Sequence, residues 1–208
     1  MTPTSPTHHT TPDRTANRLE TDCVDSRSRR RFLFGVAVAS TAGLAGCVGD
    51  ESDDATTIPT DPVALTGGLD CDACGMVIEE HYGPAGQAIY ADGEPTDREG
   101  PARFDSVTEL LVSLEDADAR GWDPRAVFVT DYSRVDYELE TRDGTTYVST
   151  HAEADAFADV AAVRFVADSD VHGSMGPDHV PFSESEDAEA FADEHGGSVL
   201  EWGDLWNR

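Results

Sequence analysis

Two segments of this chain carry the same helix-start pattern, and this repetition restricts the possible folds more than any other feature. An aromatic residue precedes Ser-x-x-Glu in Phe104-Asp105-Ser106-Val107-Thr108-Glu109 and again in Phe182-Ser183-Glu184-Ser185-Glu186. Ser followed three residues later by Glu is typical of a capping box, in which the Ser side chain accepts a hydrogen bond from a helix-start N–H. The sequence therefore predicts two capped helices in corresponding places.

Apolar residues at helical spacing follow each pattern. The two faces comprise Val107, Leu110, Leu111 and Leu114 in the first helix, and Ala188, Phe191 and Ala192 in the second. Gly121 and Gly196-Gly197 supply the expected stops, because glycine readily adopts the conformation that ends a helix. The spacing predicts that each helix buries one face.

Short strands are expected around these helices, with a hairpin turn at Arg142-Asp143-Gly144-Thr145. Apolar or alternating runs predict strands at Met76–Ile78, Gly86–Ala91, Ala126–Val129, Tyr137–Thr141, Thr146–Val148, Val163–Ala167, Val171–Pro177 and Ser198–Trp202. The Ala-rich segment Ala152–Val160 predicts a further short helix. Turn, strand, capped helix and closing strand occur twice, which favours a pseudo-duplicated α+β domain.

The N-terminal region has the features of an export signal. Residues 1–27 are rich in Thr, Pro, Ser and His without periodicity, and we expect them to be disordered. Ser28-Arg29-Arg30-Arg31-Phe32-Leu33 and the apolar run Phe34–Ala45 resemble a twin-arginine signal, although a plain anchor helix remains an alternative. The run is too short to cross a hydrocarbon core of ~30 Å. We assign residues 1–46 to this leader.

Leu44-Ala45-Gly46-Cys47 resembles a lipobox, so we expect Cys47 to become the lipid-modified first residue after cleavage. Residues 47–66 are acidic and poor in apolar side chains, which predicts a flexible tether. Residues 67–208 are then the folded domain. The expected location is the outer face of the cytoplasmic membrane, held there by lipid.

Charge narrows the possible partners. The chain has 14 arginines, no lysine and 42 acidic residues, with a formal net charge of −28. In molar salt the Debye length is roughly 3 Å, so surface carboxylates hardly repel one another. The bias is typical of adaptation to high salt, and it argues against nucleic acid, which binds basic surfaces.

Sulfur chemistry concentrates in Cys71-Asp72-Ala73-Cys74-Gly75-Met76. Thiolate and thioether are soft ligands that favour Cu(I), and Gly75 permits a tight turn between them. Cys23 lies in the leader and Cys47 is assigned to lipid, so Cys71 and Cys74 are the free pair.

Other roles for this motif stay open. The two thiols could form a disulfide outside the cell, or half of a zinc site completed by His81, His172 or His179. A thioredoxin-like motif would need a nearby cation or helix N-terminus to lower the thiol pKa, whereas Asp70 and Asp72 oppose this. Met76 alone could fill space in a core.

Several short motifs, in order, resemble the NosL family of exported lipoproteins that serve nitrous oxide reductase maturation. They cover about residues 70–202: Cys71–Met76, Gly83–Gln87, Arg103–Ser106, Gly173–Pro177, Val180–Phe182, Ala190–Ala192 and His195–Gly197. The resemblance implies two ββαβ-type halves with short antiparallel sheets, Cu(I) as the bound metal, and copper delivery to apo-nitrous oxide reductase or another copper acceptor.

The resemblance also implies site residues. Cys74 and Met76 match the family's Cys-Gly-Met and are the first candidate ligands, with Cys71 as a further ligand or a protective partner. Met175 lies in Gly-Ser-Met-Gly of the second half, where a duplicated fold could turn it toward the first motif. His81, His172 and His179 compete for a remaining position.

Motifs of common enzyme classes are absent: there is no G-x-S-x-G, P-loop, H-E-x-x-H or dinucleotide fingerprint. We therefore predict a copper-binding protein rather than an enzyme. Two other classes remain. One is an enzyme that uses Cys71 and Cys74, either a thiol–disulfide oxidoreductase or a lyase acting on organometals. The other is a copper storage or sensing lipoprotein without a delivery partner.

Overall fold

The computed structural model describes residues 60–91, 95 and 99–206. The expected export signal, Cys23 and the lipobox with Cys47 lie outside the described residues. Within the described part, no helix combines the length and the apolarity needed to cross a bilayer.

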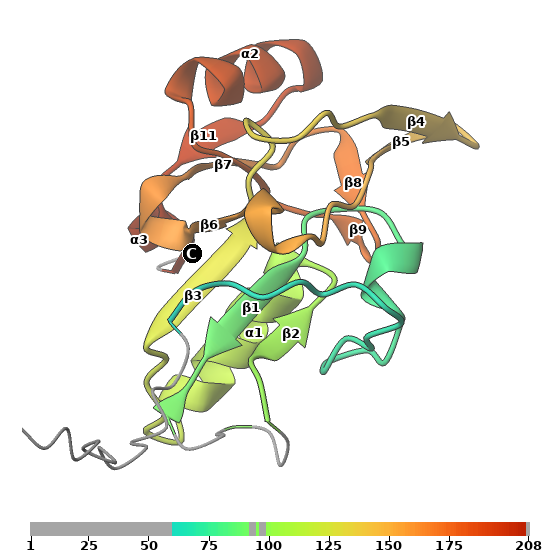
Figure 1. Cartoon of the computed structure of the whole chain (residues 1–208). Helices are drawn as coiled ribbons and strands as arrows, with labels where there is room; N and C mark the ends of the chain where they lie inside the picture. Colours follow the sequence, from blue (N-terminus) through green and yellow to red (C-terminus); the bar gives the residue numbers. More distant parts are fainter. Residues whose placement is uncertain (1–59, 92–94, 96–98, 207–208) are drawn as a thin grey trace, which may run out of the picture. The chain divides into compact units, whose positions relative to one another are not determined.

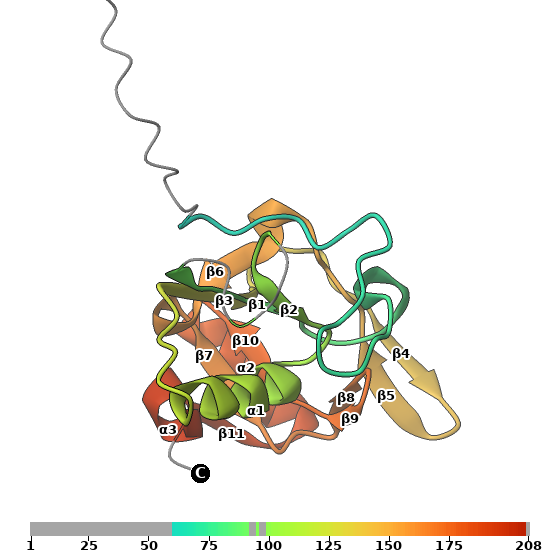
Figure 2. The same cartoon turned by 90° about the horizontal axis from the view of Figure 1, so that it is seen from below.

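The first half of the domain is a ββαβ unit. Strand β1 (Gly86–Ile89) lies between β2 (Ala102–Phe104) and β3 (Ala126–Thr130) and is antiparallel to both. Helix α1 (Val107–Asp118) connects β2 to β3 and packs against the sheet, as Figures 1 and 2 show. A Cβ at Gly86 would lie 2.8 Å from Leu110 Cδ2, so glycine permits this close approach.

The second half repeats this arrangement. Strand β7 (Arg164–Ala167) lies between β10 (Val180–Phe182) and β11 (Ser198–Leu200), again antiparallel to both, and α2 (Ser185–His195) connects β10 to β11. Order and direction match those of the first half. The predicted α+β fold with two ββαβ-type halves is therefore confirmed.

A third sheet joins the two units. It contains β4 (Leu139–Arg142), β5 (Thr145–Val148), β8 (Val171–Gly173) and β9 (Gly176–Pro177). The predicted hairpin between β4 and β5 is present, with Asp143 and Gly144 both at positive φ. Such a pair matches the twist of the flanking strands. This hairpin extends away from the helices (Figure 1).

The remaining elements are short. Strand β6 (Phe157–Asp159) adds to the first sheet beside β3, and helix α3 (Trp202–Trp206) follows β11. Single 3₁₀ turns are η1 (Ile78–Glu80), η3 (Ala154–Ala156) and η4 (Val160–Ala162).

Three predicted elements are wrong in detail. The helix expected at Ala152–Val160 is instead two 3₁₀ turns around β6, because pairing with β3 overrides the helix propensity of the alanines. Met76–Ile78 is not a strand, since Val77 makes only an isolated bridge and Ile78 begins η1. The closing strand ends at Leu200, before Trp202 begins α3.

The two helix starts also differ. Ser106 caps α1 as predicted, and its hydroxyl accepts from Glu109 N at 3.1 Å. The predicted cap by Ser183 is wrong, because the N-cap of α2 is Glu184 and makes no side-chain capping bond. Ser183 instead donates its N–H to Asp131 Oδ1 at 2.8 Å.

Packing starts earlier than residue 67. Leu65, in the segment predicted as tether, is fully buried and donates its N–H to Ala152 O at 2.7 Å. The buried Gln87 side chain binds both backbone groups of Val63, at 3.0 and 2.9 Å. This segment is therefore attached to the first sheet.

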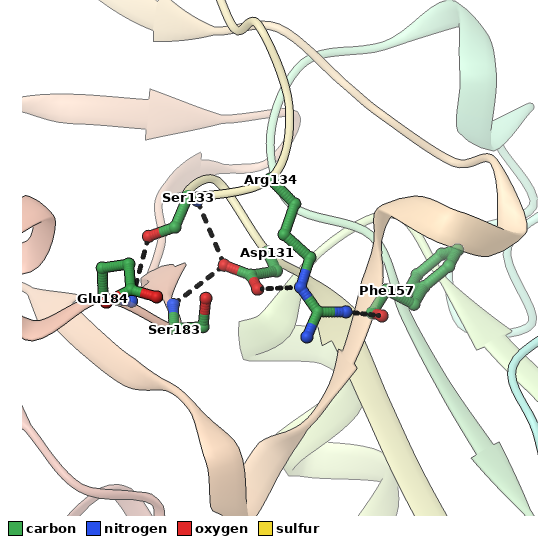
Figure 3. A network of polar contacts seen from close by, with 6 residues as sticks. All are labelled: Asp131, Ser133, Arg134, Phe157, Ser183 and Glu184. Atoms are coloured by element: carbon green, nitrogen blue, oxygen red, sulfur yellow. Dashed lines mark hydrogen bonds and ion pairs between the residues drawn. The ribbon is translucent and has the colours of Figure 1, made fainter.

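Asp131 joins the end of β3 to the start of α2 (Figure 3). This buried carboxylate accepts from the N–H groups of Ser133 at 3.1 Å and Ser183 at 2.8 Å through Oδ1. Its Oδ2 pairs with Arg134 Nε at 2.9 Å, and Arg134 also donates to Phe157 O at 3.3 Å. Asp131, in the first half, thus accepts a hydrogen bond from the backbone just before α2 of the second half.

Asp178 makes the reciprocal connection. It lies between β9 and β10, and its buried carboxylate accepts from Val107 N at 3.3 Å and Thr108 N at 3.0 Å. These are free N–H groups of the first turn of α1, where a negative group is favourable. The second half therefore fixes the start of α1.

Candidate metal centre

The segment Cys71–Met76 forms a closed turn. Cys71 N donates to Met76 O at 2.7 Å, and Gly75 N donates to Cys71 O at 2.9 Å. Gly75 has φ +75°, a backbone conformation that residues with a Cβ rarely adopt. The glycine predicted to permit this turn does so.

Hydrogen bonds to β2 hold this turn next to the start of α1. Asp72 N donates to Arg103 O at 2.8 Å, and Arg103 N donates to Asp72 Oδ2 at 2.8 Å. The Arg103 side chain adds a bond from Nε to Asp70 O at 2.8 Å. Because β2 leads directly into α1, these bonds place the thiols beside the first helical residues.

Two carboxylates meet the two thiols there. The ligand atoms of Cys71, Cys74, Asp105 and Glu109 all lie within 4.8 Å of one another. Both cysteines are free, and Cys71 Sγ donates to Glu109 Oε2 at 3.1 Å while Cys74 Sγ donates to Asp105 Oδ1 at 3.4 Å. Cys71 and Asp105 are buried, whereas Cys74 and Glu109 are half-buried. We call these four residues the thiol–carboxylate cluster.

Burial raises the pKa of the Cys71 thiol well above its usual value, and the N–H groups of Cys74 and Asp105 offset only part of this. Burial also raises the pKa of the Cys74 thiol. The negative charges of Asp105 and Glu109 raise it further, while a hydrogen bond from the Met76 N–H lowers it in part. Both sulfurs are therefore protonated at neutral pH until a cation displaces the protons.

The carboxylates share a proton unequally. Burial alone would raise the pKa of Asp105, but hydrogen bonds from Glu109, Cys71 and Ser174 together hold it below its usual value. Burial raises the pKa of Glu109, and the hydrogen bond to Asp105 raises it further. Asp105 is thus the ionised member, and Glu109 keeps its proton to higher pH.

The second half also reaches the cluster. Ser174, in the turn between β8 and β9, has its hydroxyl 2.9 Å from Asp105 Oδ2 and 3.1 Å from Asp105 O. Met175 follows it and has 58% of its surface exposed. Ser174 thus brings the turn between β8 and β9 to the cluster, whereas the approach of Met175 to the first motif stays a prediction.

The other predicted ligands lie in different settings. Met76 is half-buried and meets the cluster through its backbone. His81 ends η1, and its carbonyl oxygen accepts from Thr150 Oγ1. His172 lies in β8 with its ring against Tyr147, and His179 lies between Asp178 and β10. The cluster of close ligand atoms contains none of these three histidines.

Asp105 and Glu109 are the site residues that sequence reasoning missed. Glu109 was interpreted only as a partner of Ser106 in a capping box, and its carboxylate instead accepts from Cys71. Asp105 lay within a matched motif, Arg103–Ser106, without an assigned role. Their spacing of four residues at a predicted helix start was the available signal, because this spacing places both side chains on the same side of the helix.

Donor chemistry limits what the cluster can hold. Two thiolates suit soft ions such as Cu(I) and borderline ions such as Zn²⁺, whereas carboxylate oxygens suit harder ions or protons. Both thiols donate to carboxylates, which opposes the lowered pKa that reactive redox cysteines need. The arrangement therefore favours metal binding over thiol nucleophilicity.

Comparison with known proteins agrees with this arrangement. The NosL family model matches residues 62–208. The copper-binding lipoprotein NosL of Stutzerimonas stutzeri is 29% identical over 171 residues, covering 82% of this chain and 77% of that protein. The crystal structure of the copper chaperone NosL from Shewanella denitrificans has a TM-score of 0.53 and 26% identity, covering 70% of this chain and 96% of that one. The chain described here belongs to the NosL family.

Proposed function

We propose that this protein is a copper chaperone that binds Cu(I) through Cys71 and Cys74 and passes it to an acceptor protein. The observation that carries this proposal is the meeting of two free thiols with Asp105 and Glu109, all within 4.8 Å. The relatives are named as a copper-binding lipoprotein and a copper chaperone, which supports the same metal and the same role.

Two thiolates would hold the ion, and binding would release two protons. These protons pass to solvent, because the lowered pKa of Asp105 keeps its carboxylate ionised at neutral pH. Met76, whose backbone closes the same turn, is our choice for a thioether ligand, and the exposed Met175 for a more distant one. The three histidines remain weaker candidates.

Delivery requires an ion that can leave. Cu(I) held by two or three soft ligands keeps a position open for an incoming Cys, Met or His of the acceptor, so exchange proceeds without free copper. The acceptor we propose is apo-nitrous oxide reductase, and we propose that the protein works at the outer face of the cytoplasmic membrane, exported by the twin-arginine route and anchored through lipid on Cys47.

The decisive experiment is a Cu(I) competition titration of the full chain against a coloured chelator under reducing, anaerobic conditions. We expect Cys74→Ala and Cys71→Ser to weaken Cu(I) binding at least about 100-fold, and Met76→Leu about tenfold, as loss of a metal ligand does. Ser198→Ala, at an exposed position of β11, is the control. Wild-type affinity in both cysteine variants would remove the proposed site.

A redox enzyme is the less favoured alternative. Burial raises the pKa of both thiols, and two carboxylates contact them, which opposes thiolate formation at neutral pH. Insulin reduction by the wild type that is lost in Cys71→Ser would favour the oxidoreductase. Copper binding without transfer to any acceptor would favour storage.

A further inference from the structure

Exposed apolar side chains gather around the thiol–carboxylate cluster. Among the described residues, the two most exposed large hydrophobic side chains are Met175 at 58% and Val112 at 56%, and the next, Leu139, is at 37%. Val112 lies one helical turn after Glu109 on α1. Met175 follows Ser174, whose hydroxyl contacts Asp105. Val112 thus lies one turn from a residue of the cluster, and Met175 is the chain neighbour of a residue that contacts it.

A groove continues from the cluster along α1. It has a volume of about 440 Å³, and its lining includes Asp72, Glu109, Val112, Asp116, Arg120 and Trp122. Glu109, Val112, Asp116 and Arg120 follow one another at intervals of three or four residues, so they lie along one side of the helix. Because Glu109 belongs both to the lining of the groove and to the thiol–carboxylate cluster, a segment lying in this groove would reach the cluster.

The charges of the groove favour one kind of occupant. Beside Glu109, two carboxylates line it, those of Asp72 and Asp116. Arg120, the basic residue of this lining, lies over the ring of Trp122 at 5.3 Å from the centroid. The Arg120 charge is therefore engaged in a cation–π contact with Trp122. An acidic groove with Val112 on its rim is complementary to a segment that carries basic and apolar side chains.

We propose that this groove, with the exposed Val112 in its lining, is the docking surface for the copper acceptor. The acceptor would bind through a segment with basic and apolar residues and a Cys, Met or His ligand. This inference rests on the proposed chaperone function. Ligand exchange requires donor and acceptor ligands on the same ion, so the acceptor has to contact the protein beside the cluster.

The test measures copper transfer from the Cu(I)-loaded full chain to two recipients, copper-free nitrous oxide reductase and bathocuproine disulfonate. The variants are Val112→Asp and Asp116→Arg. Their matched controls are Leu139→Asp, also an exposed apolar residue, and Asp193→Arg, exposed on α2. A small chelator needs no docking surface, so it reports copper release alone.

We expect Val112→Asp to slow transfer to the reductase at least about tenfold, since docking would bury the new charge against the acceptor without a partner. Asp116→Arg should slow transfer and reverse its dependence on salt, because the charge attraction is lost. Transfer to the chelator should stay at the wild-type rate in both, and the two controls should match the wild type throughout.

Transfer to the reductase at the wild-type rate by both groove variants would overturn the docking surface while leaving the chaperone function intact. Equal slowing by Leu139→Asp or Asp193→Arg would also overturn it, because the effect would not be specific to the groove. By contrast, a wild type that binds Cu(I) but passes none to the reductase would overturn the proposed delivery itself.

Discussion

The carboxylate of Asp178 accepts two hydrogen bonds from Thr108, seventy residues earlier in the chain, one from the backbone N–H and one from the hydroxyl, each at 3.0 Å. A residue of the second half thereby acts as a remote cap for α1. Glu109, the next residue after Thr108, is a member of the thiol–carboxylate cluster. The position of this cluster in the first half therefore depends on a contact made by the second.

Removing this cap should destabilise the fold. We expect Asp178→Ala to lower the free energy of unfolding by about 1–3 kcal/mol, because two helix-start N–H groups and the Thr108 hydroxyl lose their acceptor. Urea denaturation followed by circular dichroism measures this. Asp193→Ala, at an exposed position of α2, should change stability by less than about 0.5 kcal/mol. Equal effects would mean that the Asp178 contacts add nothing.

Asp178 should also give stability a dependence on pH. Burial raises the pKa of this carboxyl from its usual value to about 6 in the folded protein. Between about pH 4 and pH 6 the folded state therefore binds more protons than the unfolded state. Its contribution is fully present below this window and is lost as the pH rises through it, by at most about 3 kcal/mol.

Asp178→Asn isolates this contribution, because asparagine keeps an acceptor and does not titrate. The stability of the wild type relative to Asp178→Asn should fall as the pH rises from about 4 to 6 and stay level above. Denaturation in urea at each pH gives both curves. A difference that is constant with pH would show that the carboxyl titrates alike in the folded and unfolded states.

The two carboxylates of the cluster should respond differently to amide substitution. Glu109 has the raised pKa of the pair, and glutamine can donate a hydrogen bond to Asp105, so Glu109→Gln should keep Cu(I) affinity within about threefold. Asp105→Asn removes the ionised group beside Cys74 and should weaken binding about 10–100-fold. Competition titration at pH 7 compares the two. The reverse order would mean that the proton lies on Asp105.

Ser174 should matter through the carboxylate that it contacts. Ser174→Ala removes the hydroxyl hydrogen bond to Asp105, which is worth about 1 kcal/mol, and should weaken Cu(I) binding severalfold. Ser174→Thr keeps the hydroxyl and should restore most of the affinity. If Ser174→Ala binds Cu(I) as tightly as the wild type, Asp105 is held in place without it.

Gly83 is expected to tolerate a side chain poorly. A Cβ there would lie 2.6 Å from Gly173 Cα, so Gly83→Ala should cost about 3 kcal/mol or more in unfolding free energy. Gly144→Ala is the matched control, since its φ is also positive but nothing lies within 4 Å of the new Cβ. Backbone strain alone should cost it about 1–2 kcal/mol. Thermal or urea denaturation separates the two effects.

Local signals predicted much of the fold. The spacing after Ser106 predicted α1, and Asp143-Gly144 predicted the β4–β5 hairpin, because caps and tight turns depend on neighbouring residues. The segment Phe157–Asp159 was mispredicted because its conformation is set by pairing with β3, about thirty residues away in the chain. Ser183 failed as a cap for a similar reason, since its N–H is bound by Asp131.

The candidate site, too, was predictable only in part from the sequence. The thiols were evident because cysteine is rare in this chain, with 4 among 208 residues. Asp105 and Glu109 were not, because among 42 acidic residues their spacing at a helix start was a weak signal. Bonds from Arg103 to Asp70 and Asp72 bring the Cys71–Met76 turn to the beginning of α1.

The exchange of aspartates between the halves has a consequence for the duplicated architecture. Asp131 serves the start of α2, and Asp178 serves the start of α1, so each unit carries a part that its counterpart needs. In a fragment containing one unit alone, N–H groups at the helix start would lose their acceptor, and the aspartate carboxylate would lose its donors. Although the two units share one topology, neither is expected to be an independent building block, and a gene cut between them would yield no copper protein.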